Sequence, residues 1–509
     1  MEGSGCRPLR GFLIAFFQNL SGMTTSLIHS FDLLTIRKKS RLLDIQFAHM
    51  NPLYRFALII VWVGSTLTAV AQSPPNIVFI LADDLGYGDL SCYGHRDIKT
   101  PNIDRLAQQG LLLTDFYAPS PLCSPARAGF LTGRTPFRTG IKSWIPEDQD
   151  IFLHREEITI AALLKANGYQ TFLGGKWHLN GGLGNPQQPQ PEEHGFDHWL
   201  AAHAFALPHH KNLNNYYRNG EALGEVDGFA GQLATNEAIQ WLDGRDRNKP
   251  FFLYMAYLEV HSEIASPDSF NTMYSNFTKS EIDLENLADR GPGEYYANVT
   301  HLDYQVGQLM QKLEEEGLVD NTIVIFTSDN GPVTTQWRYW WEVNLYGSTG
   351  GLRGRKADLF EGGIRVPCII RYPGKVVAGS TSNVPLHGYD LLPTICAITG
   401  IETPADRVLD GIDFSPIFNG KDLVREQPLF WGFETRPFDD PEGFSYAVRD
   451  DEWKLITDKG LERTLLYNLK DDPYEVRDLT DQQSELVAKL KGQVKKIITS
   501  IEEDRLRPR

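Results

Sequence analysis

A cysteine and an arginine lie one helical turn apart in the segment Cys123-Ser-Pro-Ala-Arg-Ala-Gly-Phe-Leu-Thr-Gly-Arg134, where together they could bind an anionic group. Pro125 suits the first turn of a helix because its missing N–H would have no intrahelical partner there, and Gly133 is typical of a helix end. Cys123 is therefore expected beside free backbone N–H groups at the positive end of the helix dipole, with Arg127 adding a fixed positive charge. A buried structural cysteine before a packed helix is the alternative, and this segment alone does not distinguish the two.

Paired acid and amide side chains follow two apolar runs that are typical of buried strands. Asp83 and Asp84 come directly after the run Asn76–Ala82, and Asp329 and Asn330 follow a β-branched run later in the chain. Open α/β sheets build their sites at the carboxyl ends of their strands. Because adjacent carboxylates repel each other, a bound cation is the natural way to keep both ionised. We therefore favour cation ligands over an exposed turn for the aspartate pair, with Asp329 and Asn330 as a second acid–amide pair.

Lysine and histidine side chains occupy other predicted strand ends. Lys176 and His178 follow paired glycines, which let the backbone approach a ligand closely, and the two side chains share one face if the segment is extended. His261 follows another apolar run, and Lys356 precedes the segment Glu361–Pro367. A lone histidine is more often structural, but Lys-x-His after two glycines at a strand end favours a functional site.

Five further histidines lie in residues 181–228, a stretch rich in Gly, Pro and Asn that we interpret as loop. They have no regular ligand spacing and no predicted helix to hold them, so they do not indicate a zinc site. We interpret them as substrate-loop or surface residues: His194, His198, His203, His209 and His210.

The chain repeats one order of elements, in which a helix is followed by an apolar strand and then by polar residues. We predict strands over 76–82, 111–117, 169–173, 251–257, 322–326 and 368–371, and helices over 102–109, 158–166, 231–242, 295–316 and 390–398. This order predicts an α/β fold with a doubly wound, mostly parallel sheet flanked by helices.

The pattern of predicted helices and strands changes at about residue 423. From there, we predict short antiparallel strands over 444–448, 453–457 and 464–467 and an amphipathic helix over 484–501. We therefore expect a catalytic domain over 72–422 and a smaller C-terminal α+β domain, an antiparallel sheet plus a helix, over 423–509.

The N-terminal region predicts export. Residues 50–71 have the form of a signal peptide, with a short positive segment, an apolar stretch over 56–70 and a small-residue cleavage site. Because this pattern lies inside the chain, we expect translation to start at Met50 and residues 1–49 to be a misassigned extension. A membrane anchor with a basic tail is the alternative, but the apolar stretch is short and interrupted for a span. We favour a periplasmic or secreted protein over an anchored one.

Composition limits the partners. The 509 residues carry a formal net charge of −16, which does not suit a nucleic-acid partner. An anionic substrate would therefore have to be bound by local lysine, arginine or metal, against the overall field. The cysteine spacing indicates neither a disulfide framework nor a zinc site, and Cys368 and Cys396 lie in apolar patterns that are typical of a core.

The order and local sequences of these segments resemble the type I sulfatases from Asn76 to about Pro473. Six separate motifs agree in order: the Asp-Asp pair, Cys-Ser-Pro-Ala-Arg, Gly-Lys-Trp-His, the histidine after the run 251–257, Ser-Asp-Asn-Gly, and Lys356 before Glu-Gly-Gly-Ile-Arg-Val-Pro. The resemblance implies the fold of the alkaline phosphatase superfamily and hydrolysis of sulfate esters. The segment Val260-His261-Ser262-Glu263 departs from the family pattern, which commonly has proline before this histidine and often again two residues after it.

The resemblance also implies catalytic roles. Cys123 would be converted to formylglycine by a formylglycine-generating or equivalent maturation enzyme, and the hydrated aldehyde would be the nucleophile. Arg127 would orient this hydrate, and His178 would take a proton from it. His261 would protonate or support the departing alkoxide.

Substrate and metal binding are implied in the same way. Lys176, His261 and Lys356 would hold the sulfate. A divalent cation, Ca²⁺ in preference to Mg²⁺, would be bound by oxygen ligands, which suit a hard ion and not zinc: Asp83, Asp84, Asp329, Asn330 and the modified residue at Cys123. Some family members have a further polar contact after Asp197, for which His203 is the nearest candidate.

The expected substrate is a sulfated small molecule or, in preference, a sulfated carbohydrate. Aromatic residues in 334–346 could stack on sugar rings, but we favour a packed loop core for this segment. Two other functions stay open: a phosphate or phosphonate ester hydrolase of the same superfamily, and a catalytically inactive protein that binds sulfated glycans and keeps Cys123 unmodified.

Overall fold

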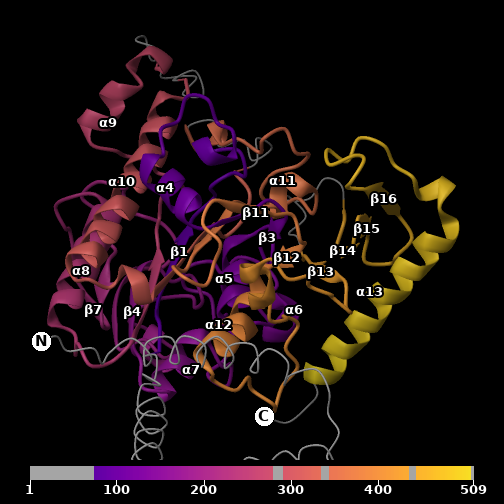
Figure 1. The fold of residues 1–509 in the computed structure, drawn as a ribbon, viewed down its shortest axis with the longest axis horizontal. Coiled ribbons are helices and arrows are strands. Elements are labelled where there is room, and N and C mark those ends of the chain that lie inside the picture. The colour runs from indigo at the N-terminus through magenta and orange to yellow at the C-terminus, as the bar shows by residue number, and fades with distance from the viewer. Residues whose placement is uncertain (1–73, 279–290, 334–342, 435–442, 506–509) are drawn as a thin grey trace, which may run out of the picture. The chain divides into compact units, whose positions relative to one another are not determined.

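The computed structural model describes residues 74–278, 291–333, 343–434 and 443–505, which Figure 1 draws as coloured ribbons. The expected extension 1–49 and the expected signal peptide 50–71 lie outside these ranges, as do four residues of the aromatic segment 334–346: Trp337, Tyr339, Trp340 and Trp341. Within the described ranges, no helix is long and apolar enough to cross a bilayer.

A ten-stranded sheet forms the centre of the described chain, and its middle strands are parallel. β1 (Asn76–Ala82) pairs in parallel with β8 (Phe251–Ala256) on one side and with β9 (Thr322–Ser328) on the other. β4 (Gln170–Lys176) extends the sheet beyond β8, and β5 (His198–Ala202) extends it beyond β4, both in parallel. The carboxyl ends of these five strands therefore lie at the same end of the sheet.

Shorter strands complete the sheet on both sides. β10 (Cys368–Arg371) runs antiparallel to β9 and to β2 (Leu111–Leu113), and β11 (Ser380–Ser382) pairs in parallel with β2. On the other side, β6 (Tyr217–Arg218) and β7 (Glu221–Ala222) add an antiparallel hairpin beside β5.

Helices cover both faces of the sheet: α5 (Cys123–Thr132), α7 (Ile160–Ala166) and α12 (Leu391–Thr399) on one, and α4 (Pro101–Gln109), α8 (Ala230–Gly244) and α10 (Gly293–Glu315) on the other. The reason is visible in β1, whose alternate residues point into two different cores. Ile77, Phe79 and Leu81 pack with the first group of helices, whereas Val78 and Ile80 pack with the second. The predicted α/β fold with a doubly wound, mostly parallel sheet is confirmed.

A second sheet and one long helix form the C-terminal part of the chain (Figure 1, orange to yellow). The sheet is antiparallel, in the order β13 (Leu429–Gly432), β14 (Tyr446–Asp450), β15 (Trp453–Thr457) and β16 (Thr464–Asn468). Leu490 and Val494 of α13 (Ser484–Arg505) share a core with Val448 and Leu455 of this sheet. The predicted antiparallel sheet plus helix is confirmed, and β13 is a strand that the sequence did not reveal.

The single strand predicted over 111–117 is wrong. After β2 the chain leaves the large sheet, and β3 (Phe116–Tyr117) pairs instead with β12 (Leu386–His387) in a sheet of two strands. The break falls at Asp115, whose carboxylate forms ion pairs with two arginines from distant parts of the chain. A charged side chain with such partners interrupts a buried strand, and its partners are not visible in the local sequence.

The interpretation of residues 181–228 as loop is incomplete, because β5, β6 and β7 lie within them. β4 also continues to Lys176, so the paired glycines belong to the strand itself. The remaining short helices are α6 (Pro136–Thr139), α9 (Asp268–Met273) and α11 (Glu361–Ile364).

Candidate active site

The predicted metal ligands lie together because they follow neighbouring parallel strands. Asp83 and Asp84 come directly after β1, and Asp329 comes directly after β9. Backbone hydrogen bonds fix these positions: the N–H of Asp83 donates to the carbonyl oxygen of Glu259 (2.9 Å), and that of Asp329 donates to the carbonyl oxygen of Ala82 (3.1 Å). The pairing of the strands therefore sets the positions of the acidic residues through the backbone alone.

Three carboxylates and one amide form a buried cluster. The backbone N–H of Asp84 donates to Asp329 Oδ1 (3.1 Å), and Asn330 Nδ2 donates to Asp84 Oδ1 (2.7 Å). Asp84 has a φ of +62°, a left-handed conformation that is uncommon outside glycine. The residues are at most 1% exposed, including Asp83. Carboxylates held this close and this deep require positive charge nearby.

Two lysines supply part of that charge. Lys176 Nζ lies 2.6 Å from Asp83 Oδ2, and Lys356 Nζ lies 2.7 Å from Asp84 Oδ1. Burial works against the ionised form of both aspartates, but the neighbouring cations, led by the lysine beside each, hold the pKa of Asp83 and Asp84 below the ordinary range. Both aspartates are therefore ionised at neutral pH.

Arg127 lies one turn into α5 and reaches the same cluster. Its Nε and Nη2 donate to Asp329 Oδ2 at 3.0 and 2.7 Å, and its Nη1 donates to the carbonyl oxygen of Lys176 at 3.1 Å. The pKa of Asp329 is nevertheless raised, because burial and repulsion from Asp83 outweigh Arg127. Asp329 is thus a carboxylate that would gain from a further cation.

Cys123 is the first residue of α5, as predicted, and is only 3% exposed. Burial raises the pKa of the thiol, although Lys176 and Lys356 act in the opposite direction. An unmodified thiol therefore stays protonated at neutral pH and is a weak nucleophile in this place.

The two predicted catalytic histidines differ in their partners. His261 Nε2 lies 3.6 Å from Asp84 Oδ2, and its Nδ1 lies 2.9 Å from the carbonyl oxygen of Ser262. His178 Nε2 lies 3.0 Å from the carbonyl oxygen of Ile145, whereas its Nδ1 is buried and has no hydrogen-bond partner among the described residues. Burial holds the pKa of His178 well below its ordinary value, so the ring is neutral.

His203 is buried beside the site, and its ring packs edge-on against His178 at 5.4 Å. Its Nε2 lies 2.6 Å from the carbonyl oxygen of Asn180. The structure thus places His203 close to the predicted catalytic residues, where its contact is with the ring of His178.

The chemistry of the donor atoms fits a cation. Asp83 Oδ1 and Asn330 Oδ1 are buried and accept no hydrogen bond from the part of the chain that the structure describes. Within the same part, the one group of acidic, histidine and cysteine atoms close enough to share an ion comprises Asp83, Asp84 and His261. Unpaired oxygens on a buried amide and a buried carboxylate suit a hard cation.

Phe205 is a residue near the site that the sequence did not reveal. Its ring centroid lies 5.2 Å from that of His261 and 6.4 Å from that of His178. It follows the end of β5 by three residues, so the strand-end pattern that located the other residues applies to it as well. The signal was missed because β5 was interpreted as loop.

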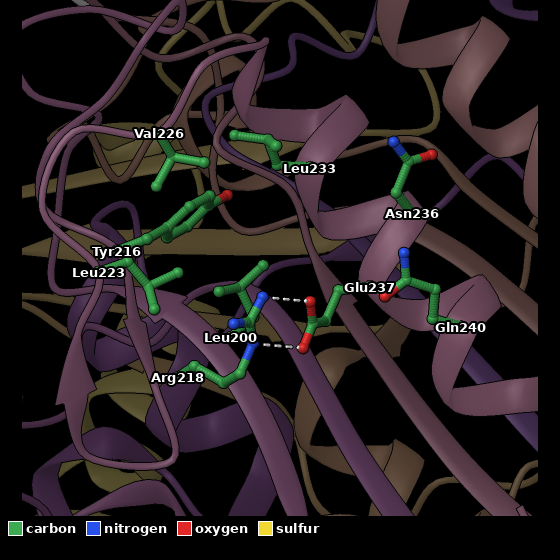
Figure 2. A pocket seen from close by; sticks show the side chains of 9 residues that line it. All are labelled: Leu200, Tyr216, Arg218, Leu223, Val226, Leu233, Asn236, Glu237 and Gln240. Atoms are coloured by element: carbon green, nitrogen blue, oxygen red, sulfur yellow. Dashed lines mark hydrogen bonds and ion pairs between the residues drawn. The ribbon is translucent and has the colours of Figure 1, made fainter. Parts of the chain in front are cut away.

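A cavity of about 180 Å³ lies elsewhere, between the β6–β7 hairpin and α8. Figure 2 shows Arg218 and Glu237 joined by two contacts, which are 2.7 and 2.8 Å long, beneath apolar side chains such as Leu223 and Val226. None of the predicted site residues lines this cavity. The candidate site is therefore the strand-end cluster and not this hollow.

Comparison with known proteins agrees with this geometry. Residues 75–401 match the family model described as Sulfatase, and residues 355–502 match the model described as N-sulphoglucosamine sulphohydrolase, C-terminal. Arylsulfatase A of Homo sapiens is 36% identical over 76% of this chain and 75% of its own length. N-acetylgalactosamine-6-sulfatase of Mus musculus is 33% identical over 72% of this chain and 70% of its own length.

Solved structures have the same fold. Ps i-CgsB, solved in complex with k-i-k-neocarrahexaose, superposes with a TM-score of 0.72 at 27% identity and covers 85% of this chain and 94% of its own. Taken with the family model and the curated relatives, this likeness places the chain in the sulfatase family of sulfuric ester hydrolases.

Proposed function

We propose that this protein removes sulfate groups from carbohydrates, with a formylglycine made from Cys123 as nucleophile and Ca²⁺ as the metal. The observation that carries the proposal is the burial of Asp83, Asp84, Asp329 and their cationic partners around the N-terminus of the helix that begins at Cys123. So many buried charges in one place have a large desolvation penalty, which a catalytic site for an anionic ester explains.

Asp83, Asp84, Asp329 and Asn330 would hold the metal. The ion would offset the carboxylates and polarise the sulfate when bound. Two buried oxygens without partners, on Asp83 and Asn330, support a further positive ligand, and an all-oxygen donor set favours Ca²⁺ over zinc.

The buried thiol supports conversion of Cys123. Its raised pKa makes it a poor nucleophile, so the residue needs another chemistry to attack at sulfur. A hydrated aldehyde would supply one hydroxyl to attack and a second whose proton can be removed later, which neither serine nor cysteine has.

Lys176 and Lys356 bind the sulfate oxygens in this proposal. Their ammonium groups point to the aspartates that flank the N-terminus of α5, which places two positive charges where the ester must be held. Arg127 positions this region: its guanidinium joins Asp329 to the backbone of β4. Preorganised charges of this kind stabilise negative charge that develops during the reaction.

The histidines move the protons. His178 is neutral and has one buried ring nitrogen without a partner, so it can accept a proton from the nucleophile. His261 Nε2 lies 3.6 Å from Asp84 Oδ2. Burial is the main cause that lowers the pKa of His261, so a proton that this ring takes up is readily given to the leaving oxygen.

A sulfated carbohydrate is the substrate class that the relatives favour. N-acetylgalactosamine-6-sulfatase is named for a sulfated sugar, and Ps i-CgsB was solved with a neocarrahexaose. We also propose that the chain is exported by the signal peptide over 50–71 and meets its maturation enzyme on that route.

One rival function has an observation in its favour. A phosphonate monoester hydrolase of Agrobacterium radiobacter has the same fold, with a TM-score of 0.60 at 21% identity. Fold alone does not separate the two chemistries, because relatives on one scaffold host different reactions. A catalytically inactive protein that binds sulfated glycans is the other alternative.

The test combines one peptide with two assays. Mass spectrometry of tryptic peptide 106–127 from protein made in its native host should show an aldehyde at Cys123. The mature protein should hydrolyse N-acetylgalactosamine 6-sulfate or 4-nitrophenyl sulfate faster than an aryl phosphonate. The Cys123→Ala variant should hydrolyse none of these esters. An intact thiol, or preference for the phosphonate, would remove the proposal.

A further inference from the structure

Phe205 is placed at the carboxyl end of the sheet with the residues that bind sulfate. β5 pairs with β4 in parallel so that Ala202 lies opposite Lys176, and Phe205 follows three residues later. Lys176 Nζ lies over the face of the Phe205 ring, 5.9 Å from its centroid. The ring is thus next to the cation on one side and next to His261, 5.2 Å away, on another.

The exposure of this ring separates it from the core. Phe205 is 36% exposed, whereas Lys176 and His178 beside it are fully buried. Phe205 therefore lies at the edge of the buried site, with one part of its ring packed against the predicted catalytic side chains and another part accessible to a ligand. Core packing does not require such a ring to remain open, because burial would be favourable by itself.

Hydrogen bonds hold the segment that carries Phe205. Asn215 Nδ2 donates to the carbonyl oxygen of Phe205 at 2.7 Å, and Asn215 Oδ1 accepts from the N–H of Leu207 at 3.1 Å. The N–H of Asn214 also donates to the carbonyl oxygen of Leu207 at 2.7 Å. One side chain thus binds the backbone at two points directly after the ring, which helps to preorganise it for contact.

We infer that Phe205 is the platform on which the ring that carries the sulfate group stacks, and that it sets the preference of the site for cyclic substrates. The inference rests on the proposed function. A sulfate held by Lys176 and Lys356 brings the first atoms of the leaving group to the border where Phe205 is exposed. The C–H face of a pyranose, or an aryl ring, can then cover its exposed apolar surface.

The test separates ring binding from sulfate binding. Phe205→Leu keeps an apolar side chain but removes the aromatic face, and Phe205→Tyr keeps that face. The assay uses N-acetylgalactosamine 6-sulfate or 4-nitrophenyl sulfate, depending on which of the two the mature protein hydrolyses. With that substrate, Phe205→Leu should raise KM about three- to tenfold over wild type, with little change in kcat. Phe205→Tyr should restore KM. Inhibition by inorganic sulfate, which has no ring, should be unchanged in both variants.

Tyr304→Leu is the matched control, because this aromatic residue is 46% exposed on α10. It should leave KM and kcat unchanged. A wild-type KM in Phe205→Leu overturns the inference and leaves sulfate ester hydrolysis standing. Weaker inhibition by inorganic sulfate in the same variant also overturns it, since the ring would then act by supporting Lys176. If mature wild-type protein hydrolyses neither sulfate, the proposed function fails and the inference fails with it.

Discussion

Single side chains at this site each have more than one task, and Lys176 shows this most directly. Its ammonium group neutralises buried Asp83 at 2.6 Å, its backbone carbonyl accepts a hydrogen bond from Arg127, and its charge faces Phe205. Removing the charge would therefore affect both the aspartate and the bound sulfate. Buried charge that serves two partners is sensitive to substitution in a way that surface charge is not.

Lys176→Met should lower kcat about 100- to 1,000-fold, because a preorganised positive charge is lost where negative charge develops. It should also weaken inhibition by inorganic sulfate. Steady-state kinetics with sulfate as competitor measures both effects. Lys489→Met is the control, since Lys489 is 61% exposed and its ion-pair partner, 2.8 Å away, is the partly exposed Asp450. Unchanged sulfate inhibition in Lys176→Met would show that this lysine does not hold the substrate.

At the scale of elements, the acidic residues that follow the neighbouring strands β1 and β9 lie beside each other. Asp84 and Asp329 are joined by one hydrogen bond, but Asp83 Oδ1 and Asn330 Oδ1 have no partner in the described chain. A bound cation would tie the two strand ends together and relieve the repulsion that raises the pKa of Asp329. The metal is therefore expected to contribute to stability as well as to catalysis.

Removal of the metal with EGTA should lower the Tm, and added Ca²⁺ should restore it more fully than Mg²⁺. Ligand at 100 times its Kd stabilises a protein by about 2.7 kcal/mol, which gives a shift that scanning calorimetry can detect. Asp329→Asn should reduce the change in Tm that EGTA and Ca²⁺ cause, because one charged metal ligand is lost. A Tm that EGTA does not change in wild-type protein would contradict the metal site.

A buried ion network joins α11 to the C-terminal sheet. Lys454 Nζ on β15 lies 2.9 Å from Glu361 Oε1 and 2.8 Å from Glu475 Oε1, and the side chains are fully buried. Burial opposes the charge on Glu361, but Lys454 outweighs it and lowers its pKa to about 2, whereas burial raises the pKa of Glu475 to about 7. Glu475 Oε2 also accepts the N–H of Glu361 at 2.7 Å, five residues after Lys356.

Lys454→Met should lower the free energy of unfolding by about 3 to 5 kcal/mol, because it removes the cation that the buried carboxyl groups of Glu361 and Glu475 share. Arg365, 3.4 Å away, remains beside Glu361 in this variant. Denaturant unfolding measures the change, and Lys489→Met should alter it by less than about 0.5 kcal/mol. If Lys454→Met were as stable as the control, the network would have no structural importance.

At the scale of the whole molecule, the sequence predicted the elements that local pattern determines. β1 and β10 were predicted to the residue, because an unbroken apolar run marks a strand buried on both faces. The break at Asp115, the strand β13 and the position of Phe205 depend on partners far away in the chain, such as the arginines that bind Asp115. The candidate site could be predicted because its residues follow predictable strand ends, whereas the contacts among those residues required the structure.

The last prediction concerns the expected boundary at residue 422. Trp431 donates from Nε1 to the carbonyl oxygen of Ala118 at 2.9 Å, and its ring packs edge-on against Tyr117 at 5.2 Å. Arg138, which follows α5, donates to the carbonyl oxygen of Ser500 on α13 at 2.9 Å. The C-terminal sheet thus shares a core with Leu122, directly before the helix that begins at Cys123, and α13 shares another with Phe137. The described residues from 74 onward belong to one compact unit.

A chain that ends at residue 422 should therefore aggregate or lack cooperative unfolding, because it exposes the apolar surface of this shared core. The protein that extends to residue 505 should unfold in a single calorimetric transition, with equal calorimetric and van't Hoff enthalpies. Trp431→Ala in the full chain should lower stability by about 3 to 5 kcal/mol, which tests the same contact without truncation. A soluble chain over 72–422 that unfolds cooperatively and hydrolyses sulfate esters would show instead that the C-terminal part is an independent domain.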